Sequence, residues 1–543
     1  MREKEQSHKA DMEEETTLQK LRSKATEFLL REDWNESIKT YSQFISLCQQ
    51  QIFNTNQKSD LLKLQKSLCL SLSNRAEARF RSRDLEEALK DCEEALQIDN
   101  THFKTMVCKG KILLNLNRYS LALDCFKKGL LLESHCNNGN LEMLNGFIEK
   151  CKKLDYLSRT GNFDVSNWVT SGLSGICPEL GEFVGNVEIR RSKISGRGLF
   201  STKNIDVGGL ILVTKAVATE RCILPKSSNG SLGENAQLVM WKNFIDKVNE
   251  STSKCLKFCH LITKLSIGEN EEDLDIPDIS LFKPETKAGF FPNEKLDVDV
   301  DKILSILDVN SLVEDAVSAK VVGKNSDYYG VGLWLLPSFI NHSCIPNVRR
   351  LHIGDYVLVL ASREVKAGEE VTFAYYDVLS PLSKRKEMAK TWGFKCECKR
   401  CKYEEEMQSK PEMGDIERGL ERGVDVGCAI FRLEECMRRW VVRGKEKGYF
   451  RASFWKAISE AYESDKIIRR WGRKMPALEP IVDSLMEAIG SDERVLKVLI
   501  RKLKKSGCGF GETERAIKLG RGVYGKVVKK QALRILLELG VHE

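Results

Sequence analysis

Four cysteines in two separate stretches have the composition of a zinc site. Cys396, Cys398 and Cys401 form a close cluster, and Cys344 lies about fifty residues earlier, in the stretch Asn341-His342-Ser343-Cys344-Ile345-Pro346-Asn347. Structural zinc binds four ligands in a tetrahedron, so three clustered thiolates need a fourth ligand, and Cys344 is the natural candidate. A shared metal would hold the later segment over the earlier one and make it the wall of a pocket.

The remaining cysteines do not suggest a disulfide scaffold. The chain has 18 cysteines, and most of them are scattered singly along helical stretches, as are Cys92, Cys108, Cys125 and Cys428. In a reducing compartment such thiols are usually small buried hydrophobes. The same interpretation applies to four residues of an insert in the β-rich region: Cys222, Cys255, Cys259 and His260. Their spacing does not make the ligand pairs that a second zinc site needs.

The composition is that of a soluble globular protein with several domains. A chain of 543 residues is too long for one hydrophobic core, so we expect two to four domains. Apolar runs such as Leu210-Ile211-Leu212-Val213 are far shorter than the ~20 residues of a membrane span, and the N-terminal residues lack the apolar stretch of a secretory signal. We therefore expect an intracellular protein, in the nucleus or the cytoplasm, without membrane contact. The net charge of +8 predicts a solvated basic surface and does not support nucleic-acid binding.

The elements that must position these residues begin with a helical repeat in the first third of the chain. Ala88 and Ala122 lie 34 residues apart, and Ala76 and Gly110 precede them in the same register. A 34-residue helix-turn-helix period resembles the tetratricopeptide repeat, in which small residues let paired helices pack closely. An earlier unit fits around Ala25, Trp34, Ser37 and Tyr41, but only with an insertion near residues 50–66. We predict an α-solenoid over residues 1–155 that binds a protein partner on its concave face.

One class of partner can be compared with the sequence directly. Repeats that hold the acidic C-terminal tail of chaperones place Lys and Asn at fixed positions of their first helices. Asn74 and Lys104 fit these positions, whereas Arg22 replaces a lysine and Thr26 replaces an asparagine. The set is incomplete, so we do not predict this partner.

After a linker over residues 156–183, the pattern alternates in the manner of strands. Strands are predicted at 187–190, 210–216, 356–360 and 371–375. An insert over about 221–319 interrupts them and contains a helical segment near 300–317. Residues 404–543 return to helical periodicity with many Lys and Arg, which is typical of the wet face of amphipathic helices. The predicted fold is therefore a multidomain α+β protein.

Four motifs occur in a fixed order along this β-rich part: Gly196-Arg197-Gly198-Leu199-Phe200, Asn341 to Asn347, Gly368 to Tyr375, and Cys396 to Cys401. Together they resemble the SET family of S-adenosylmethionine-dependent protein-lysine methyltransferases. The resemblance implies a SET domain over 184–378 and a zinc-binding post-SET segment over 379–403. The stretches 329–338 and 376–379 are most similar to the group that carries a MYND zinc module within the SET domain, but that module is not found in this sequence.

The resemblance implies a site for the methyl donor. Gly196 and Gly198 would leave room for the ligand at a backbone turn, with Arg197 near its carboxylate. In the family, a knot-like crossing of the chain holds the donor, and an aromatic ring stacks on its adenine. The residues of this sequence at the remaining donor-binding positions are Asn310, Ser338, Asn341, His342 and Phe394.

Methyl transfer to lysine is a direct displacement by a neutral amine, and a free lysine has a pKa of ~10.4. The site must therefore favour the neutral amine by desolvation and by nearby positive charge. Tyr375 matches the catalytic tyrosine of the family, which contacts both amine and donor, and we expect Tyr376 and Phe373 to face away from it. Trp392 takes the place of a tyrosine that usually lines the substrate channel, so it bears on the substrate and on the number of methyl groups added.

Three functions follow from these observations. The first is a protein-lysine methyltransferase, acting on a histone or another protein, whose repeats select partners. The alternative is an interaction scaffold whose SET domain has lost catalysis, which Trp392 favours and which Tyr375, Asn341 and His342 oppose. The third, DNA binding by the C-terminal region, depends only on its charge.

Overall fold

The computed structural model describes residues 2–55, 58–132, 138–171, 178–223, 230–269, 274–284, 299–314, 328–407, 410–506 and 510–537. The chain divides into two compact units. Unit 1 comprises Met1–Arg159, Asn249–Leu261 and Pro284–Val298, and unit 2 comprises Thr160–Val248, Ile262–Lys283 and Asp299–Glu543. Among the described residues, no helix is long and apolar enough to cross a membrane.

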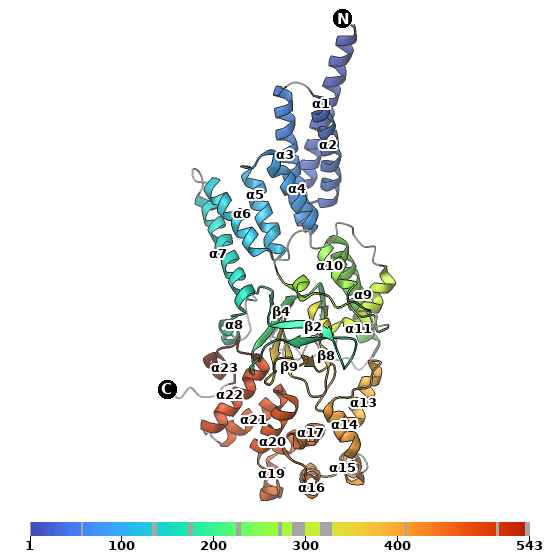
Figure 1. Ribbon diagram of the computed structural model, residues 1–543, viewed down its shortest axis with the longest axis vertical. Coiled ribbons are helices and arrows are strands. Elements are labelled where there is room, and N and C mark those ends of the chain that lie inside the picture. The colour runs from blue at the N-terminus through green and yellow to red at the C-terminus, as the bar shows by residue number, and fades with distance from the viewer. Residues whose placement is uncertain are drawn as a thin grey trace. The chain divides into compact units, whose positions relative to one another are not determined.

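Unit 1 is built from helices that pack in consecutive pairs (Figure 1). They are α1 (Arg2–Leu30), α2 (Trp34–Asn54), α3 (Lys58–Arg81), α4 (Leu85–Ile98), α5 (Phe103–Asn115), α6 (Tyr119–Leu132) and α7 (Asn138–Thr160). The starts of α4 and α6 are 34 residues apart, which confirms the predicted tetratricopeptide-like period. The starts of α2 and α4 are 51 residues apart, because α2 and α3 are longer than their counterparts. The predicted insertion therefore lengthens two helices.

Small residues allow the close helix packing that the repeat requires. Gly110 of α5 lies against Phe126 of α6, and a Cβ at Gly110 would stand 2.7 Å from the phenylalanine ring. Ala76, Ala88 and Ala122 are fully buried in the same core. A larger side chain at any of these positions would force the helices apart, so the small residues are required by the packing of the repeat.

Part of the insert belongs to unit 1. The backbone N–H of Leu256 donates to the carboxylate of Glu86 at 2.9 Å, and Lys254 donates to the Ser82 carbonyl at 2.8 Å. Both acceptors lie at or near the turn between α3 and α4. The insert that interrupts the strands in sequence thus contributes residues 249–261 to the compact unit of the repeats.

Unit 2 contains the predicted β-rich region as several small sheets. A four-stranded antiparallel sheet has the order β1-β4-β10-β9, a second has the order β5-β7-β6, β2 pairs with β3, and β8 pairs with β11 in parallel. The strands are β1 (Phe183–Val184), β2 (Val187–Arg191), β3 (Arg197–Ser201), β4 (Leu210–Lys215), β5 (Ala218–Ile223), β6 (Leu312–Val313), β7 (Tyr328–Leu333), β8 (Asn341–His342), β9 (Val348–Ile353), β10 (Tyr356–Ala361) and β11 (Thr372–Phe373). The four strands predicted from alternation are confirmed as β2, β4, β10 and a shorter β11.

The helices between these strands differ in one respect from the prediction. The insert holds α9 (Gly230–Lys254), α10 (Leu256–Ile262), the short 3-10 helix η1 (Ile279–Phe282) and α11 (Val300–Asn310). The predicted helix near 300–317 was too long, because α11 ends at Asn310 and the chain then forms β6 against β7. A second 3-10 helix, η2 (Leu336–Phe339), leads into β8.

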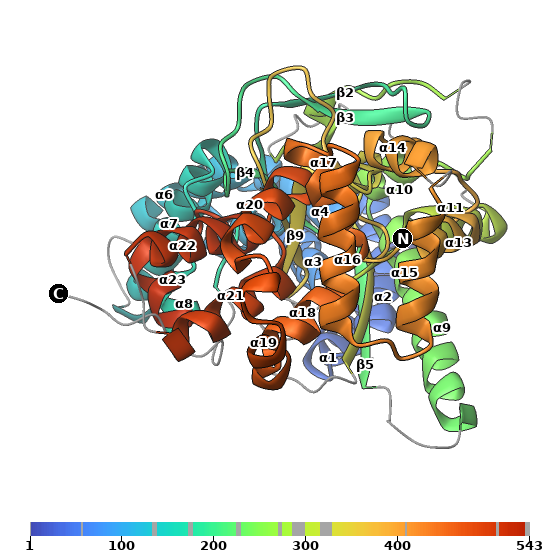
Figure 2. The ribbon, with the colours of Figure 1, turned by 90° about the horizontal axis from the view of Figure 1, so that it is seen from below.

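The remaining helices follow the last strand and pack mainly on one another. They are α13 (Leu382–Thr391), α14 (Lys399–Met407), α15 (Pro411–Glu421), α16 (Val426–Arg439), α17 (Gly444–Ser453), α18 (Trp455–Glu463), α19 (Asp465–Trp471), η3 (Gly472–Lys474), α20 (Leu478–Ile489), α21 (Glu493–Ser506), α22 (Phe510–Tyr524) and α23 (Lys530–Leu536). Figures 1 and 2 show α20, α21 and α22 gathered next to β9, and α22 contacts both β9 and β10.

The segment predicted as a linker, residues 156–183, contains ordered structure. The end of α7 and a short helix, α8 (Ser166–Thr170), lie within it. Just before α8, the Val165 N–H donates to the Val527 carbonyl at 2.9 Å, and α8 packs on α23. Part of this segment is therefore tied to the last helices of unit 2.

Candidate active site and metal centre

The four cysteines predicted as zinc ligands lie together. Their sulfur atoms are all within 4.8 Å of one another, and Cys344 Sγ is 3.8 Å from Cys396 Sγ and 3.6 Å from Cys401 Sγ. A tetrahedron with Zn–S bonds of about 2.3 Å has S–S edges of about 3.8 Å, so the spacing fits zinc. Hydrogen bonds from the other three thiols hold the pKa of Cys344 well below its usual value. Zinc binds cysteine as the thiolate, so a low pKa at Cys344 suits a metal ligand.

Two buried arginines and a buried glutamate support the cysteine cluster. Arg385 donates to Cys401 Sγ at 3.1 Å and to the Glu404 carboxylate. Arg400 donates to Glu404 at 3.0 Å and to the carbonyls of Val378 and Cys344, at 2.7 and 3.4 Å. Buried guanidinium groups offset the negative charge of thiolates and of Glu404. The prediction missed this support, although Arg400 and Glu404 have the i, i+4 spacing of a helical ion pair.

A parallel strand pair brings the Asn341 motif beside the Tyr375 motif. Thr372 pairs with Asn341 and Phe373 pairs with His342. Beyond β11, the Tyr375 N–H donates to His342 Nδ1 at 3.0 Å, and the Tyr376 ring stacks on the imidazole at 4.2 Å between centroids. On its other side, His342 Nε2 lies 3.3 Å from Cys344 Sγ. The imidazole therefore links the cysteine cluster to the backbone of Tyr375.

Asn347, which the prediction did not single out, also holds the segments of β8 and β11 together. Its side-chain carbonyl accepts from the Thr372 N–H at 2.7 Å, and its amide donates to the Glu370 carbonyl at 2.8 Å. Asn347 is almost completely buried. A buried asparagine that satisfies backbone groups of a second segment keeps the two segments in register.

The glycine motif contacts this crossing through Glu370. The Asn341 side chain donates to Glu370 Oε1 at 2.8 Å and to the carbonyls of Arg197 and Ser195, at 3.1 and 3.2 Å. A Cβ on Gly198 would stand 2.4 Å from Glu370 Oε1, so even one methyl group here would displace this carboxylate. Gly196 has a φ of +43°, a conformation that glycine adopts readily.

Arg197 is held by the insert. Only 5% of the residue is exposed, and its Nη1 donates to the carbonyls of Lys264 and Asp275 at 2.7 and 3.1 Å. Its guanidinium also lies over the Phe339 ring, at 5.2 Å from the centroid. The structure thus shows Arg197 joining β3 to the insert, and its role toward the donor's carboxylate stays a prediction.

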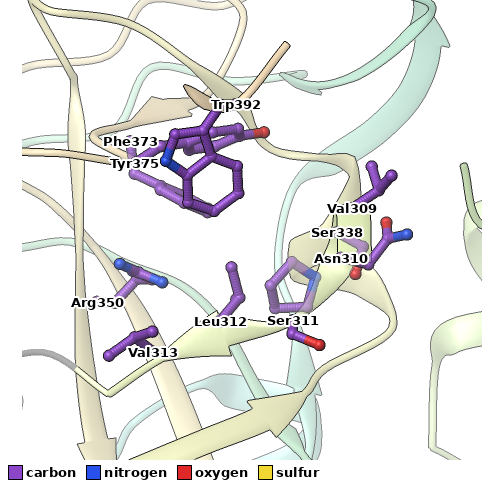
Figure 3. Close-up of a pocket in the computed structure, with 11 residues that line it drawn as sticks. Val309, Asn310, Ser311, Leu312, Val313, Ser338, Arg350, Phe373, Tyr375 and Trp392 are labelled. Carbon is purple, nitrogen blue, oxygen red and sulfur yellow. The ribbon is translucent and has the colours of Figure 1, made fainter. Parts of the chain in front are cut away.

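A narrow cavity of about 50 Å³ brings the predicted tyrosine, tryptophan, serine and asparagine to one place (Figure 3). It is lined by Val309, Asn310, Ser311, Leu312, Val313, Pro337, Ser338, Arg350, Phe373, Tyr375 and Trp392. Gly196, Arg197, Gly198, Asn341, His342 and Phe394 do not line it. The predicted site residues therefore divide between this cavity and the neighbouring crossing of β8 and β11.

The polar groups around the cavity are fixed by backbone contacts. The Tyr375 hydroxyl donates to the Ile340 carbonyl at 3.0 Å, and the Ser338 hydroxyl donates to the Trp334 carbonyl at 3.0 Å. Asn310 donates to the Ser266 and Ile306 carbonyls at 2.8 and 2.7 Å. Burial raises the pKa of Tyr375 far above its usual value, so its hydroxyl keeps its proton at neutral pH.

The aromatic residues correct one prediction. Phe373 was expected to face away from Tyr375, but both line the cavity, because residues two apart on an extended chain share a face. Tyr376 does face the other side, where its hydroxyl is 3.6 Å from Cys344 Sγ. Trp392 is 40% exposed and lies 5.1 Å from the Tyr375 ring between centroids. The Phe394 ring is 5.4 Å from the His342 ring.

In unit 1, two of the positions compared with chaperone-binding repeats are tied to each other. Lys104 donates to Asn74 at 2.9 Å, and Asn74 donates to the Tyr41 hydroxyl at 3.0 Å. The hydroxyls of Tyr41 and Thr26 are 2.9 Å apart. Thr26, Asn74 and Lys104 lie on the first helices of three successive repeats, α1, α3 and α5. Together with Tyr41 of α2 they form one row of hydrogen bonds.

The comparisons with known proteins agree with this geometry. Residues 196–376 match the family model of the SET domain. A methyltransferase of Gibberella zeae is 25% identical over 392 residues, which are 68% of this chain and 49% of that protein. Histone-lysine N-methyltransferase SMYD3 of Mus musculus is 40% identical over 113 residues, 20% of this chain and 25% of that protein. A SET and MYND domain-containing protein of Dictyostelium discoideum is 26% identical over 192 residues, 34% of this chain and 31% of that protein.

This chain therefore spans half or less of the length of these curated relatives. Among solved structures, the TPR2B domain of yeast Sti1 in its pHsp70 complex is 19% identical, with a TM-score of 0.21. That similarity covers 25% of this chain and 98% of the Sti1 chain.

Proposed function

We propose that this chain, which carries a SET domain and has relatives among the SET and MYND proteins and other SET methyltransferases, is a protein-lysine N-methyltransferase that uses S-adenosylmethionine. The observation that carries the proposal is the position of Tyr375. It lies at the crossing of β8 and β11 and lines a cavity that also contains Asn310, Ser338 and Trp392. These are the positions at which the SET resemblance requires donor-binding and substrate-binding side chains.

When bound, S-adenosylmethionine supplies an electrophilic methyl group on a sulfonium. The residues that would hold it are Asn310 and Ser338 at the cavity, Asn341 and His342 at the crossing, and Phe394 beside His342. Their side chains already have backbone or ring contacts that fix their orientation. A preorganised site needs little rearrangement on binding, which is how positioning contributes to catalysis.

The cavity walls favour the reactive form of the substrate. Phe373, Tyr375, Trp392, Leu312 and Val313 surround the space with mostly apolar surface. Removing water from a lysine ammonium lowers its pKa from about 10.4, so a larger fraction becomes the neutral amine. The Tyr375 hydroxyl, which donates its proton to the Ile340 carbonyl, can accept a hydrogen bond from that amine and orient its lone pair.

The metal has a structural role in this proposal. The four thiolates of Cys344, Cys396, Cys398 and Cys401 would hold zinc with no open coordination position. Phe394 lies two residues before Cys396, and Trp392 lies two residues before Phe394. The metal would therefore fix both aromatic side chains against the crossing of β8 and β11.

The helical repeats supply the partner-binding part of the proposal. Unit 1 has the 34-residue helix period of a protein-interaction module, and we propose that its concave face binds a protein that brings the lysine substrate. The substrate can be a histone or another protein, and the intracellular location stays a prediction.

Transfer of a radiolabelled methyl group to a protein extract tests the function. The wild type should label protein, and Tyr375→Phe should reduce labelling by on the order of a hundredfold or more, in the range of positioned proton-bearing groups. Tyr156→Phe, at an exposed position in α7, is the matched control and should keep full activity. Absence of labelling by the wild type, together with retained binding of a protein partner, would instead identify an interaction scaffold.

A further inference from the structure

Arg350 places a positive charge in the wall of the cavity that contains Tyr375. It is the only charged side chain among the described residues that line this cavity. It lies on β9, is half-buried, and its guanidinium carbon is 4.5 Å from the centroid of the Phe373 ring. A guanidinium over an aromatic face is held in place by the ring's negative electrostatic potential. The charge therefore has a defined position beside the reacting centre.

The cavity has two distinct ends (Figure 3). Asn310 and Ser338 lie at one end, and Arg350 and Val313 lie at the other, with Tyr375 and Trp392 along one side between them. Val313, at the Arg350 end, is 42% exposed, and Val309, at the other end, is 37% exposed, so both ends of the cavity reach the surface. Under the proposed function, Asn310 and Ser338 mark the donor end. The substrate lysine then enters from the other end, and the residues that flank it pass next to Arg350.

The charge of Arg350 acts on groups inside the cavity. Burial raises the pKa of Tyr375, and the positive charge of Arg350 opposes this rise. The same charge attracts a carboxylate carried by the substrate, and the two groups can form an ion pair.

We propose that Arg350 is a specificity-determining residue that selects lysines with an aspartate or glutamate next to them in the substrate. The inference deepens the proposed methyltransferase function and rests on it. Arginine suits this task because its planar fork of five N–H donors can hold a carboxylate in two hydrogen bonds alongside contacts within the protein. The other described residues that line the cavity carry no charge, so the selection of a substrate carboxylate falls to Arg350.

The proposal predicts the sequence context of the methylated lysines. A protein extract is treated with enzyme and a deuterated methyl donor, and the labelled lysines are mapped by mass spectrometry. Wild-type sites should contain Asp or Glu within two residues more often than unlabelled lysines of the same proteins. Arg350→Gln should lose this enrichment, and Arg350→Glu should shift it toward Lys and Arg.

Peptides copied from the mapped sites measure how strongly the enzyme prefers an acidic residue beside the lysine. Each peptide is compared with a twin in which the flanking Glu is replaced by Gln. We expect the wild type to prefer the Glu peptide by about five- to tenfold in kcat/KM, as for a partly exposed ion pair of ~1 kcal/mol. Arg350→Gln should bring the ratio close to one, and Arg350→Lys should keep part of it. A ratio taken within one variant is independent of how much of that variant folds.

Arg190→Gln is the matched control. Arg190 also lies over a phenylalanine, at 4.1 Å from the Phe200 centroid, but it is outside the cavity. The ratio of kcat/KM between the Glu and Gln peptides should be the same for Arg190→Gln as for the wild type. Equal rates for Glu and Gln peptides in the wild type, or an unchanged preference in Arg350→Gln, would overturn the inference while leaving the methyltransferase function intact. If the wild type labels no lysine at all, the proposed function fails, and this inference fails with it.

Discussion

Asp492 accepts a hydrogen bond from Arg349 at 2.8 Å and thereby joins the segment before α21 to β9. Asp492 is 3% exposed and also accepts from Arg494, whose guanidinium reaches Asp377, two residues after Tyr375. These ion pairs connect the start of α21 to β9 and to the segment that follows Tyr375. The C-terminal helices form part of the framework that positions Tyr375, in addition to any contact with substrate.

Replacement of Asp492 should be costly and dependent on pH. Burial alone would raise the pKa of Asp492, but Arg349 and Arg494 outweigh it and hold this pKa well below its usual value. A depressed carboxyl pKa stabilises the fold above the unfolded pKa of about 3.9, and this contribution is lost as the pH falls toward the folded pKa. We expect Asp492→Asn to lower the free energy of unfolding by about 3 kcal/mol at pH 7.

Thermal unfolding of both proteins from pH 7 to pH 2.5 measures this dependence. The difference between wild type and Asp492→Asn should shrink below about pH 4. Asp483→Asn removes an exposed ion pair with Arg515 and should cost about 1 kcal/mol or less at any pH. A difference that stays constant down to pH 2.5 would rule out the ion pairs of Asp492 as its cause.

Loss of the metal should weaken donor binding without touching Tyr375. In Cys398→Ser, or after removal of metal by a chelator, Phe394 and Trp392 lose the support of the cysteine cluster. An aromatic contact is worth up to about 1.5 kcal/mol, so calorimetry should show S-adenosylmethionine binding up to about tenfold more weakly. Cys428→Ser, at a half-buried cysteine outside the cluster, should bind zinc and donor as the wild type does. Unchanged donor affinity in metal-free protein would contradict the prediction.

Trp392 should limit how many methyl groups the cavity accepts. Its indole packs against Tyr375 at 5.1 Å between centroids, where it occupies space that a smaller side chain would leave open. Trp392→Tyr should therefore increase the share of dimethylated and trimethylated product, measured by mass spectrometry of a single peptide. Trp440→Tyr, in the C-terminal helices, serves as control. If both variants give the wild-type product distribution, Trp392 does not set the degree of methylation.

Gly198 should be intolerant of even one methyl group. A Cβ there would overlap Glu370 Oε1, the atom that accepts a hydrogen bond from Asn341. We expect Gly198→Ala to destabilise the protein by about 1–3 kcal/mol, since overpacking must move Glu370 away. Gly511→Ala has open space around the new Cβ in α22 and should be neutral or stabilising by up to about 1 kcal/mol. Equal melting temperatures for wild type and Gly198→Ala would disprove the steric requirement.

Local sequence patterns determined much of the architecture. The 34-residue period of Ala88 and Ala122 predicted the helix pairs, because each repeat is specified by its own spacing of small and apolar residues. Alternation predicted the strands of unit 2, because a strand with one buried face shows that face every second residue. The cysteine cluster was also predictable, because zinc accepts few ligand types at few spacings.

Contacts between residues far apart in the chain were decided by the tertiary structure alone. No spacing rule relates Arg350 to Tyr375, Asp492 to Arg349, or Gly198 to Glu370. Each pair meets only because separate strands and helices fold onto one another. The position of a charge in a cavity wall likewise depends on every element around it. The sequence by itself therefore determined the repeats, the strands and the cysteine ligands, and the folded packing decided which side chains line the cavity together.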